Sequence, residues 1–142
     1  MKTWLIYALL SAFCASLVSI FGKVGLKDLD SNTATALRAV IMALFLIFVV
    51  AVQGKFDNLS DIFANKKSVI FIILSGIAGA SSWLFYFLAL KEGKISQVAP
   101  IDKLSVVFSV ILAVIIFKEK VTLIHALAIF LIFLGGLILA IF

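Results

Sequence analysis

The sequence predicts an all-α integral membrane protein whose chain crosses the bilayer about five times. Two observations support this prediction. Hydrophobic residues make up 65% of the 142 residues and the mean hydropathy is +1.31, far above the range of water-soluble domains. These residues also gather in runs long enough to cross roughly 30 Å of hydrocarbon as a helix, which rises about 1.5 Å per residue. Lipid is therefore the solvent of most of this chain.

The first predicted span covers residues 3–22, which carry no charged side chain, and Lys2 and Lys23 flank its two ends. This run is too long for the core of a typical signal peptide, so we expect it to remain in the membrane. The second span covers residues 31–53 and contains one charged residue, Arg38, near its start. A charged residue inside a span is costly and commonly functional, which makes Arg38 a candidate site residue.

The third span is predicted over residues 68–90, and its last turns are rich in aromatic residues. The fourth covers residues 96–117, with Pro100 in or near its first turn, and the fifth covers residues 121–142. The longest connection, residues 54–67, carries apolar residues at helical spacing among polar ones. A short helix in the membrane interface and an ordinary polar loop fit this connection equally well. We therefore assign residues 1–142 to one transmembrane domain.

Motifs for catalysis or metal binding are absent from the sequence. Its one cysteine, Cys14, lies inside an apolar span, and its one histidine, His125, lies near the start of another. We find no phosphate-binding loop, no paired metal ligands and no nucleophile with a base near it in sequence. We therefore expect no enzymatic activity, no cofactor and no metal. The net charge of +5 does not predict nucleic-acid binding, because the lysines stand at helix ends, where they can face lipid headgroups.

The basic residues are balanced between the two sides of the membrane. Those predicted on the side of the N-terminus are Lys2, Lys55, Lys66, Lys67, Lys118 and Lys120. Those predicted on the other side are Lys23, Lys27, Arg38, Lys91, Lys94 and Lys103. Because the Lys and Arg bias sets orientation, a chain with almost no bias can insert both ways, which is the sequence condition for an antiparallel homodimer. A single orientation set by one or two dominant charges fits equally well.

Six short motifs follow one another along the chain. They are Phe21-Gly22-Lys23, Ala36-Leu37-Arg38-Ala39, Tyr86-Phe87-Leu88-Ala89-Leu90-Lys91-Glu92-Gly93, Val98-Ala99-Pro100, Phe117-Lys118-Glu119-Lys120 and Gly135-Gly136. In this order and spacing, the chain resembles the EamA domain of the drug/metabolite transporter superfamily over nearly its whole length. The resemblance implies an EamA-like half-transporter unit, a multi-pass protein of a bacterial-type cytoplasmic membrane.

The resemblance also implies a second subunit. In the common longer members of the superfamily the five-helix unit occurs twice, in opposite orientations, whereas this chain has one copy. An antiparallel homodimer is the simplest source of the second copy, and a heterodimer with a related chain is the alternative. The family is similar to the small multidrug resistance proteins, which use a glutamate in their first span. Residues 3–22 contain no acid, so export of lipophilic cations by that mechanism is not expected.

Polar residues on the predicted helices outline a candidate cavity. On the fourth span, Asp102, Ser105 and Ser109 share one face of an otherwise apolar helix. On the third span, Tyr86 shares a face with small residues. Such faces either line a water-filled path or let helices pack closely through small residues. Arg38 and Asp102 enter their helices from the same membrane side, and each is expected on the order of 9 Å deep.

We expect Asp102, Arg38 and Lys103 to form a charged cluster at one end of a central substrate cavity, with Lys23 at its mouth. Charges in hydrocarbon cost roughly 2.5 to 3.5 kcal/mol each, so they tend to face the interior of a bundle or water. Pro100 is the predicted hinge, because it frees a backbone carbonyl. In the alternative interpretation, Arg38 and Lys103 reach the headgroups and Asp102 only neutralises one of them. Three basic residues and one acid favour an anionic or zwitterionic solute.

The resemblance, together with these polar residues, implies a secondary transporter that moves a small metabolite across the membrane by alternating access. Its expected partners are membrane lipid, the small-molecule substrate and a second subunit. Two other functions fit the same sequence. One is a non-transporting assembly or regulatory subunit, in which the charged cluster is structural. The other is a flippase of a lipid-linked intermediate.

Overall fold

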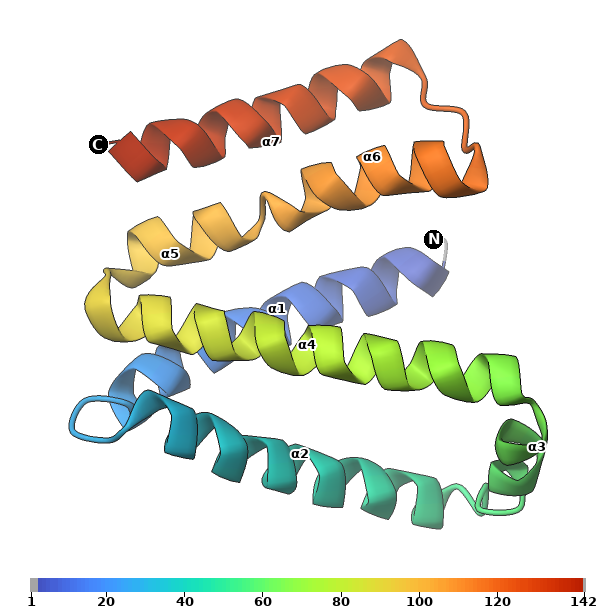
Figure 1. Ribbon diagram of the computed structural model, residues 1–142. Helices are drawn as coiled ribbons and strands as arrows, with labels where there is room; N and C mark the ends of the chain where they lie inside the picture. Colours follow the sequence, from blue (N-terminus) through green and yellow to red (C-terminus); the bar gives the residue numbers. More distant parts are fainter. Residues whose placement is uncertain (1–2, 142) are drawn as a thin grey trace. The chain divides into compact units, whose positions relative to one another are not determined.

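The computed structural model describes residues 3–141, and the regular structure of this range consists of α-helices (Figure 1). They are α1 (Thr3–Gly25), α2 (Ser31–Val52), α3 (Asn58–Ala64), α4 (Lys66–Glu92), α5 (Ile95–Asp102), α6 (Ser105–Phe117) and α7 (Leu123–Ile141). Counting α5 and α6 as one, five are long and apolar enough to cross a membrane. The predicted all-α membrane fold with about five spans is confirmed. Lys2 and Phe142, at the ends of the predicted spans, lie outside the described residues.

The chain divides into two compact units. The first, here called the α2–α4 unit, is Val24–Lys91 and contains α2, α3 and α4. The second, called the α5–α7 unit, combines the described parts of Met1–Lys23 and Glu92–Phe142, and therefore contains α5, α6, α7 and nearly all of α1. Each unit is described by itself below.

A side-chain cap starts α2. The carboxylate of Asp30 accepts hydrogen bonds from the backbone N–H and the hydroxyl of Thr33, each at 2.8 Å. A helix start leaves its first N–H groups without partners, and Asp30 satisfies one of them. The backbone bond from Thr33, then its hydroxyl bond, hold the pKa of Asp30 below its ordinary value, and the charge of Lys91 acts in the same direction. Lys91 also donates to the carbonyl of Leu29 at 3.1 Å, which links the end of α4 to the turn before α2.

The buried residues of the α2–α4 unit gather at this turn. Leu26, Phe87 and Leu90 are its buried hydrophobic residues within the described chain, and Ser31 and Thr35 are its buried polar ones. The hydroxyl of Thr35 donates to the carbonyl of Ser31 at 2.7 Å and so finds its partner inside its own helix. From this end α2 and α4 run antiparallel, and α3 joins them at the other end (Figure 1).

The connection over residues 54–67 contains the short helix α3 rather than an irregular loop throughout. Gly54 precedes it with φ +63°, a left-handed conformation that glycine adopts without a steric penalty, and so turns the chain away from the end of α2. The end of α6 uses the same conformation at a residue with a side chain. Lys118 has φ 53°, and the next N–H, from Glu119, donates to the carbonyl of Ala113 at 3.4 Å.

The fourth span is interrupted between α5 and α6 (Figure 1). Pro100 is the sixth residue of α5 and has no backbone N–H, so it cannot make the usual bond to the carbonyl four residues earlier. After it, the N–H groups of Lys103 and Leu104 donate to the carbonyls of Pro100 and Ile101, three residues back, at 3.1 and 2.9 Å. These tighter bonds satisfy the backbone but break the regular helix just after Asp102.

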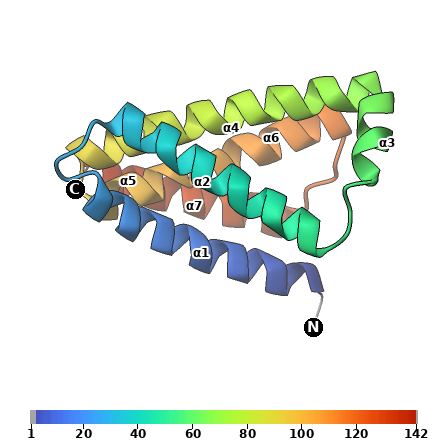
Figure 2. The ribbon, with the colours of Figure 1, turned by 90° about the horizontal axis from the view of Figure 1, so that it is seen from below.

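α7 packs alongside both α5 and α6 in the α5–α7 unit (Figures 1 and 2). The approach is tight at Gly136, where an added Cβ would lie 2.8 Å from Cδ2 of Leu104 and 3.6 Å from the carbonyl oxygen of Pro100. Small residues allow membrane helices to approach this closely. The neighbouring Gly135 would meet nothing within 4 Å. Only the second glycine of the pair is therefore required by packing against the break.

We predict that Gly136→Leu lowers the thermal denaturation temperature of the purified protein in detergent. The new side chain must displace Leu104 and separate α7 from the break, and overpacking of this kind costs about 1 to 3 kcal/mol. Gly135→Leu is the matched control, since it makes the same change in helix propensity at a position with open space. An equal loss for both variants would show that the contact with Leu104 is not what requires glycine.

We also predict that Asp30→Asn lowers the denaturation temperature at pH 7 and that the difference from the native chain shrinks steadily as the pH falls below about 4. Because folding lowers the pKa of Asp30, its ionised form stabilises the fold above the ordinary pKa of an aspartate. That stability is lost as the pH falls through the lowered pKa. Asp28→Asn is the control, as no side-chain hydrogen bond of Asp28 is found within residues 3–141. A difference that persists unchanged at pH 3 would show that the stabilisation does not come from the ionised carboxylate of Asp30.

Candidate functional site

Two charged residues lie at the break in the fourth span. Asp102 ends α5 and Lys103 follows it, and Nζ of Lys103 lies 3.1 Å from Oδ2 of Asp102. Measured from Ile95, the pair lies on the order of 11 Å along the span. An irregular backbone at such a depth is tolerated only where protein covers it or water fills a cavity beside it. The break and its two charges therefore form one candidate site.

The two charges are not buried by the rest of the described chain. The side chain of Lys103 is 59% exposed and that of Asp102 is 32% exposed. Neighbouring residues of a regular helix do not face one another, so this contact depends on the turn that follows Asp102. Any movement of that turn would also change the pairing of the two charges.

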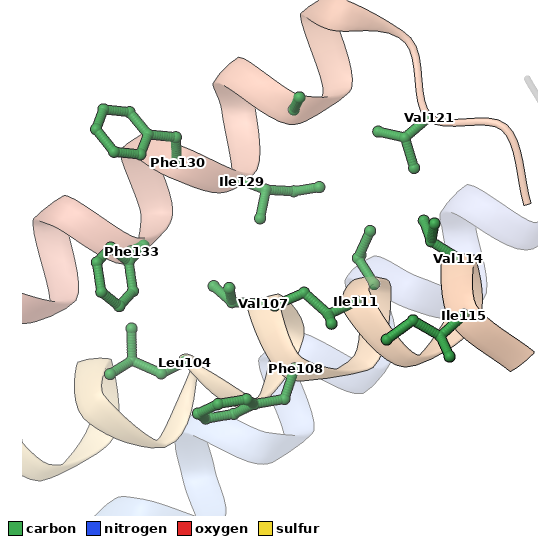
Figure 3. Close-up of a pocket in the computed structure, with 12 residues that line it drawn as sticks. Leu104, Val107, Phe108, Ile111, Val114, Ile115, Val121, Ile129, Phe130 and Phe133 are labelled. Carbon is green, nitrogen blue, oxygen red and sulfur yellow. The ribbon is translucent and has the colours of Figure 1, made fainter.

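Ser105 and Ser109 lie on α6, one turn apart and exposed. Because the helix is interrupted before Ser105, the predicted stripe with Asp102 does not run along one regular helix. A groove of ≈ 570 Å³ lies between α6 and α7, and its walls are entirely apolar (Figure 3). It is lined by Leu104, Val107, Phe108, Val110, Ile111, Val114, Ile115, Val121, Ala126, Ile129, Phe130 and Phe133. Neither serine is among these residues, so α6 has a serine face and a separate groove face.

Lys23 lies in the last turn of α1 and is partly buried. Its Nζ donates to the carbonyl of Gly93 at 2.8 Å, in the turn between α4 and α5. This bond satisfies a backbone acceptor that no helix satisfies and fixes the end of α1 within the α5–α7 unit. Its predicted place at the mouth of a charged cluster stays a prediction.

Arg38 is the eighth residue of α2 and is partly buried against aromatic rings of α4. Its guanidinium carbon lies 3.9 Å from the ring centroid of Trp83 and 4.9 Å from that of Phe87. A cation over an aromatic face is attracted by the ring, most strongly by tryptophan. Trp83 and Phe87 stack with centroids 5.6 Å apart, and Tyr86 meets each of them edge-on at 5.8 Å.

From the sequence, Arg38 and Tyr86 are predicted site residues, whereas Trp83 and Phe87 are not. The signal for these two rings was their spacing of four residues, which places them on one face of the third span, next to Tyr86. The spacing does not predict which helix packs against this face. We call Arg38, Trp83, Tyr86 and Phe87 the arginine–aromatic cluster.

The predicted site residues thus fall into two groups. Asp102, Lys103, Ser105 and Ser109 belong to the α5–α7 unit, as do Lys23 and the predicted hinge Pro100, whereas Arg38 and Tyr86 belong to the α2–α4 unit. Pairing of Arg38 with Asp102 stays a prediction. Within residues 3–141, no three His, Cys, Asp or Glu side chains lie close enough to hold a metal ion. His125 instead pairs with Thr122, whose hydroxyl lies 2.9 Å from its Nδ1.

Comparison with known proteins places this arrangement in context. Residues 2–141 match the EamA-like transporter family. A protein of Sinorhizobium sp, named an uncharacterized transporter in the cobO 3' region, is 40% identical over 141 residues. The alignment covers 99% of this chain and 99% of that protein, so the similarity is not confined to one segment. No solved structure matches.

Proposed function

Because this chain belongs to the EamA-like transporter family and is a multi-pass membrane transporter, we propose that it moves a small metabolite by alternating access. We place it in the cytoplasmic membrane, as an antiparallel homodimer. The substrate enters and leaves past Asp102 and Lys103.

The interruption of the fourth span carries this proposal. Secondary transporters commonly bind substrate at discontinuous helices near the middle of the membrane, where unwound backbone and charged side chains are available to the solute. Here the turn between α5 and α6 supplies both, and its bonds to carbonyls three residues back join two rigid helices. A turn of this kind can absorb a change of angle between the helices without disturbing either one. Pro100 and the contact of Leu104 with Gly136 define where that change occurs.

The number of spans and the distribution of the charges support the dimer. A unit of five spans has its ends on opposite sides of the membrane, so two copies inserted in opposite directions give a symmetric pair. The basic residues are evenly divided between the two sides, which removes the usual barrier to insertion both ways. A heterodimer with a related chain satisfies the same geometry and is the alternative.

One observation favours a second function, flipping of a lipid-linked intermediate. The groove between α6 and α7 is lined only by apolar side chains, and its ≈ 570 Å³ suits a hydrocarbon chain better than a polar metabolite (Figure 3). In that case the apolar tail of the lipid occupies the groove face of α6 and the headgroup passes the break.

Water accessibility along α6 tests the transport path. We predict that Ser109→Cys, on a Cys14→Ser background, reacts with a membrane-impermeant maleimide faster than Phe108→Cys does. Both positions lie at nearly the same depth, but Phe108 lines the apolar groove. Labelling of Phe108→Cys alone, by a lipid-soluble maleimide but not by the impermeant one, would favour the flippase. Protection of both cysteines from both reagents would contradict a water-filled path and point to a non-transporting subunit.

The orientation of the chain tests the dimer. We predict that Thr3→Cys and Ser60→Cys, each on the Cys14→Ser background, label from both sides of the intact membrane. A population inserted in both directions presents each site to both compartments. Labelling of each site from one side only would rule out the antiparallel homodimer and leave the heterodimer as the source of the second copy.

A further inference from the structure

The arginine–aromatic cluster places a cation inside a membrane span. Arg38 lies seven residues beyond the start of α2, on the order of 11 Å along the helix. A charged side chain at such a depth is expensive unless it is paired or reaches water, and arginine has a stem long enough to reach the headgroups. In this structure the side chain lies on the rings of α4 instead, at 3.9 Å from Trp83 and 4.9 Å from Phe87.

The rings occupy only one part of the guanidinium group. A cation–π contact uses the flat face of this planar group, whereas its five N–H donors point outward in the plane. Within the described residues, these donors make no hydrogen bond and no ion pair. The ion pair of Asp102 with Lys103 does not involve Arg38. The cluster therefore satisfies the face of Arg38 and leaves its donor edge available to a ligand.

Such an arrangement selects a particular ligand chemistry. Two parallel N–H donors of an arginine match the two oxygens of a carboxylate or phosphate, and the match is directional as well as electrostatic. The rings hold the guanidinium in place, so little side-chain freedom is lost when an anion binds. The neighbouring apolar rings also strengthen a charge-assisted hydrogen bond by excluding water.

We propose that Arg38, held on Trp83 and Phe87, is an oxyanion-binding site whose ligand presents a carboxylate or a phosphate. As the substrate site of the transporter, it rests on the proposed function and makes the transported solute an organic anion. As a binding site, it is testable without transport. The oxyanion comes either from a soluble solute or from a lipid headgroup.

The chain carries its own reporter for this site. It has two tryptophans, Trp4 and Trp83, so Trp4→Phe leaves Trp83, next to the guanidinium, as the sole tryptophan. We expect the Trp83 fluorescence of this variant, purified in maltoside micelles, to change saturably with succinate or inorganic phosphate. Chloride at the same ionic strength should produce no such change.

Variants of Arg38 separate a site from a general charge effect. Arg38→Lys keeps the charge without the planar pair of donors and should weaken binding about tenfold or more, and Arg38→Gln should abolish it. Lys27→Gln, which removes one positive charge from the turn before α2, should bind like the parent. Circular dichroism and size exclusion check that each variant is folded. If Arg38→Gln is not folded, the weaker binding of Arg38→Lys tests the site instead.

The two sources of the oxyanion give different results. A response to succinate or phosphate identifies a soluble anion, whereas a response to phosphatidylglycerol alone, absent with diacylglycerol, identifies a lipid headgroup. Both support the site. A response that is absent, or equal in Arg38→Gln, overturns it. So does a response that appears only in Asp102→Asn, because Asp102 would then occupy the donor edge. Micelles have no barrier to cross, so this result is independent of the labelling of Ser109→Cys, and either proposal can fail alone.

Discussion

Backbone hydrogen bonding in hydrocarbon is the constraint on which the rest of this structure depends. No water is available there, so each N–H and C=O group must find a partner within the protein, and helices achieve this locally. The exceptions lie where the helices end or break. Lys23 and Lys91 donate to the carbonyls of Gly93 and Leu29, and the break after Asp102 closes its own bonds three residues apart.

The cost of charge in the membrane is the second constraint, and the two units meet it in different ways. In the α5–α7 unit Lys103 lies beside Asp102, a pair made possible by the interrupted helix. In the α2–α4 unit Arg38 lies on aromatic rings, which attract a cation without neutralising it. The first arrangement depends on the turn between α5 and α6 and would change if that turn moved, whereas the second holds a positive charge against the rings. A transporter needs both properties, since it must move and must recognise its solute.

Lipid also changes what packing means in this protein. Large apolar side chains such as Phe45 and Phe71 are more than half exposed, because lipid is their solvent and burial brings no hydrophobic gain. Close packing of helices occurs instead at a glycine, which has no side chain. Gly136 lets Leu104 approach α7, and so joins the break to its neighbouring helix. The same principle leaves the apolar groove between α6 and α7 open to hydrocarbon.

Sequence alone determined the fold class, the number of spans, the short helix as one of two options, and the unusual residues Arg38, Pro100 and Asp102. These follow from hydropathy and charge, which act locally along the chain and need no knowledge of neighbours. Only the tertiary structure decided that Arg38 contacts Trp83 and Phe87. It also decided that Leu104 packs where Gly136 has no side chain, and that Ser105 and Ser109 lie outside the groove. The physical reason is that these helices are apolar on nearly every side. Hydropathy therefore does not fix how each helix rotates, and rotation selects which side chains meet.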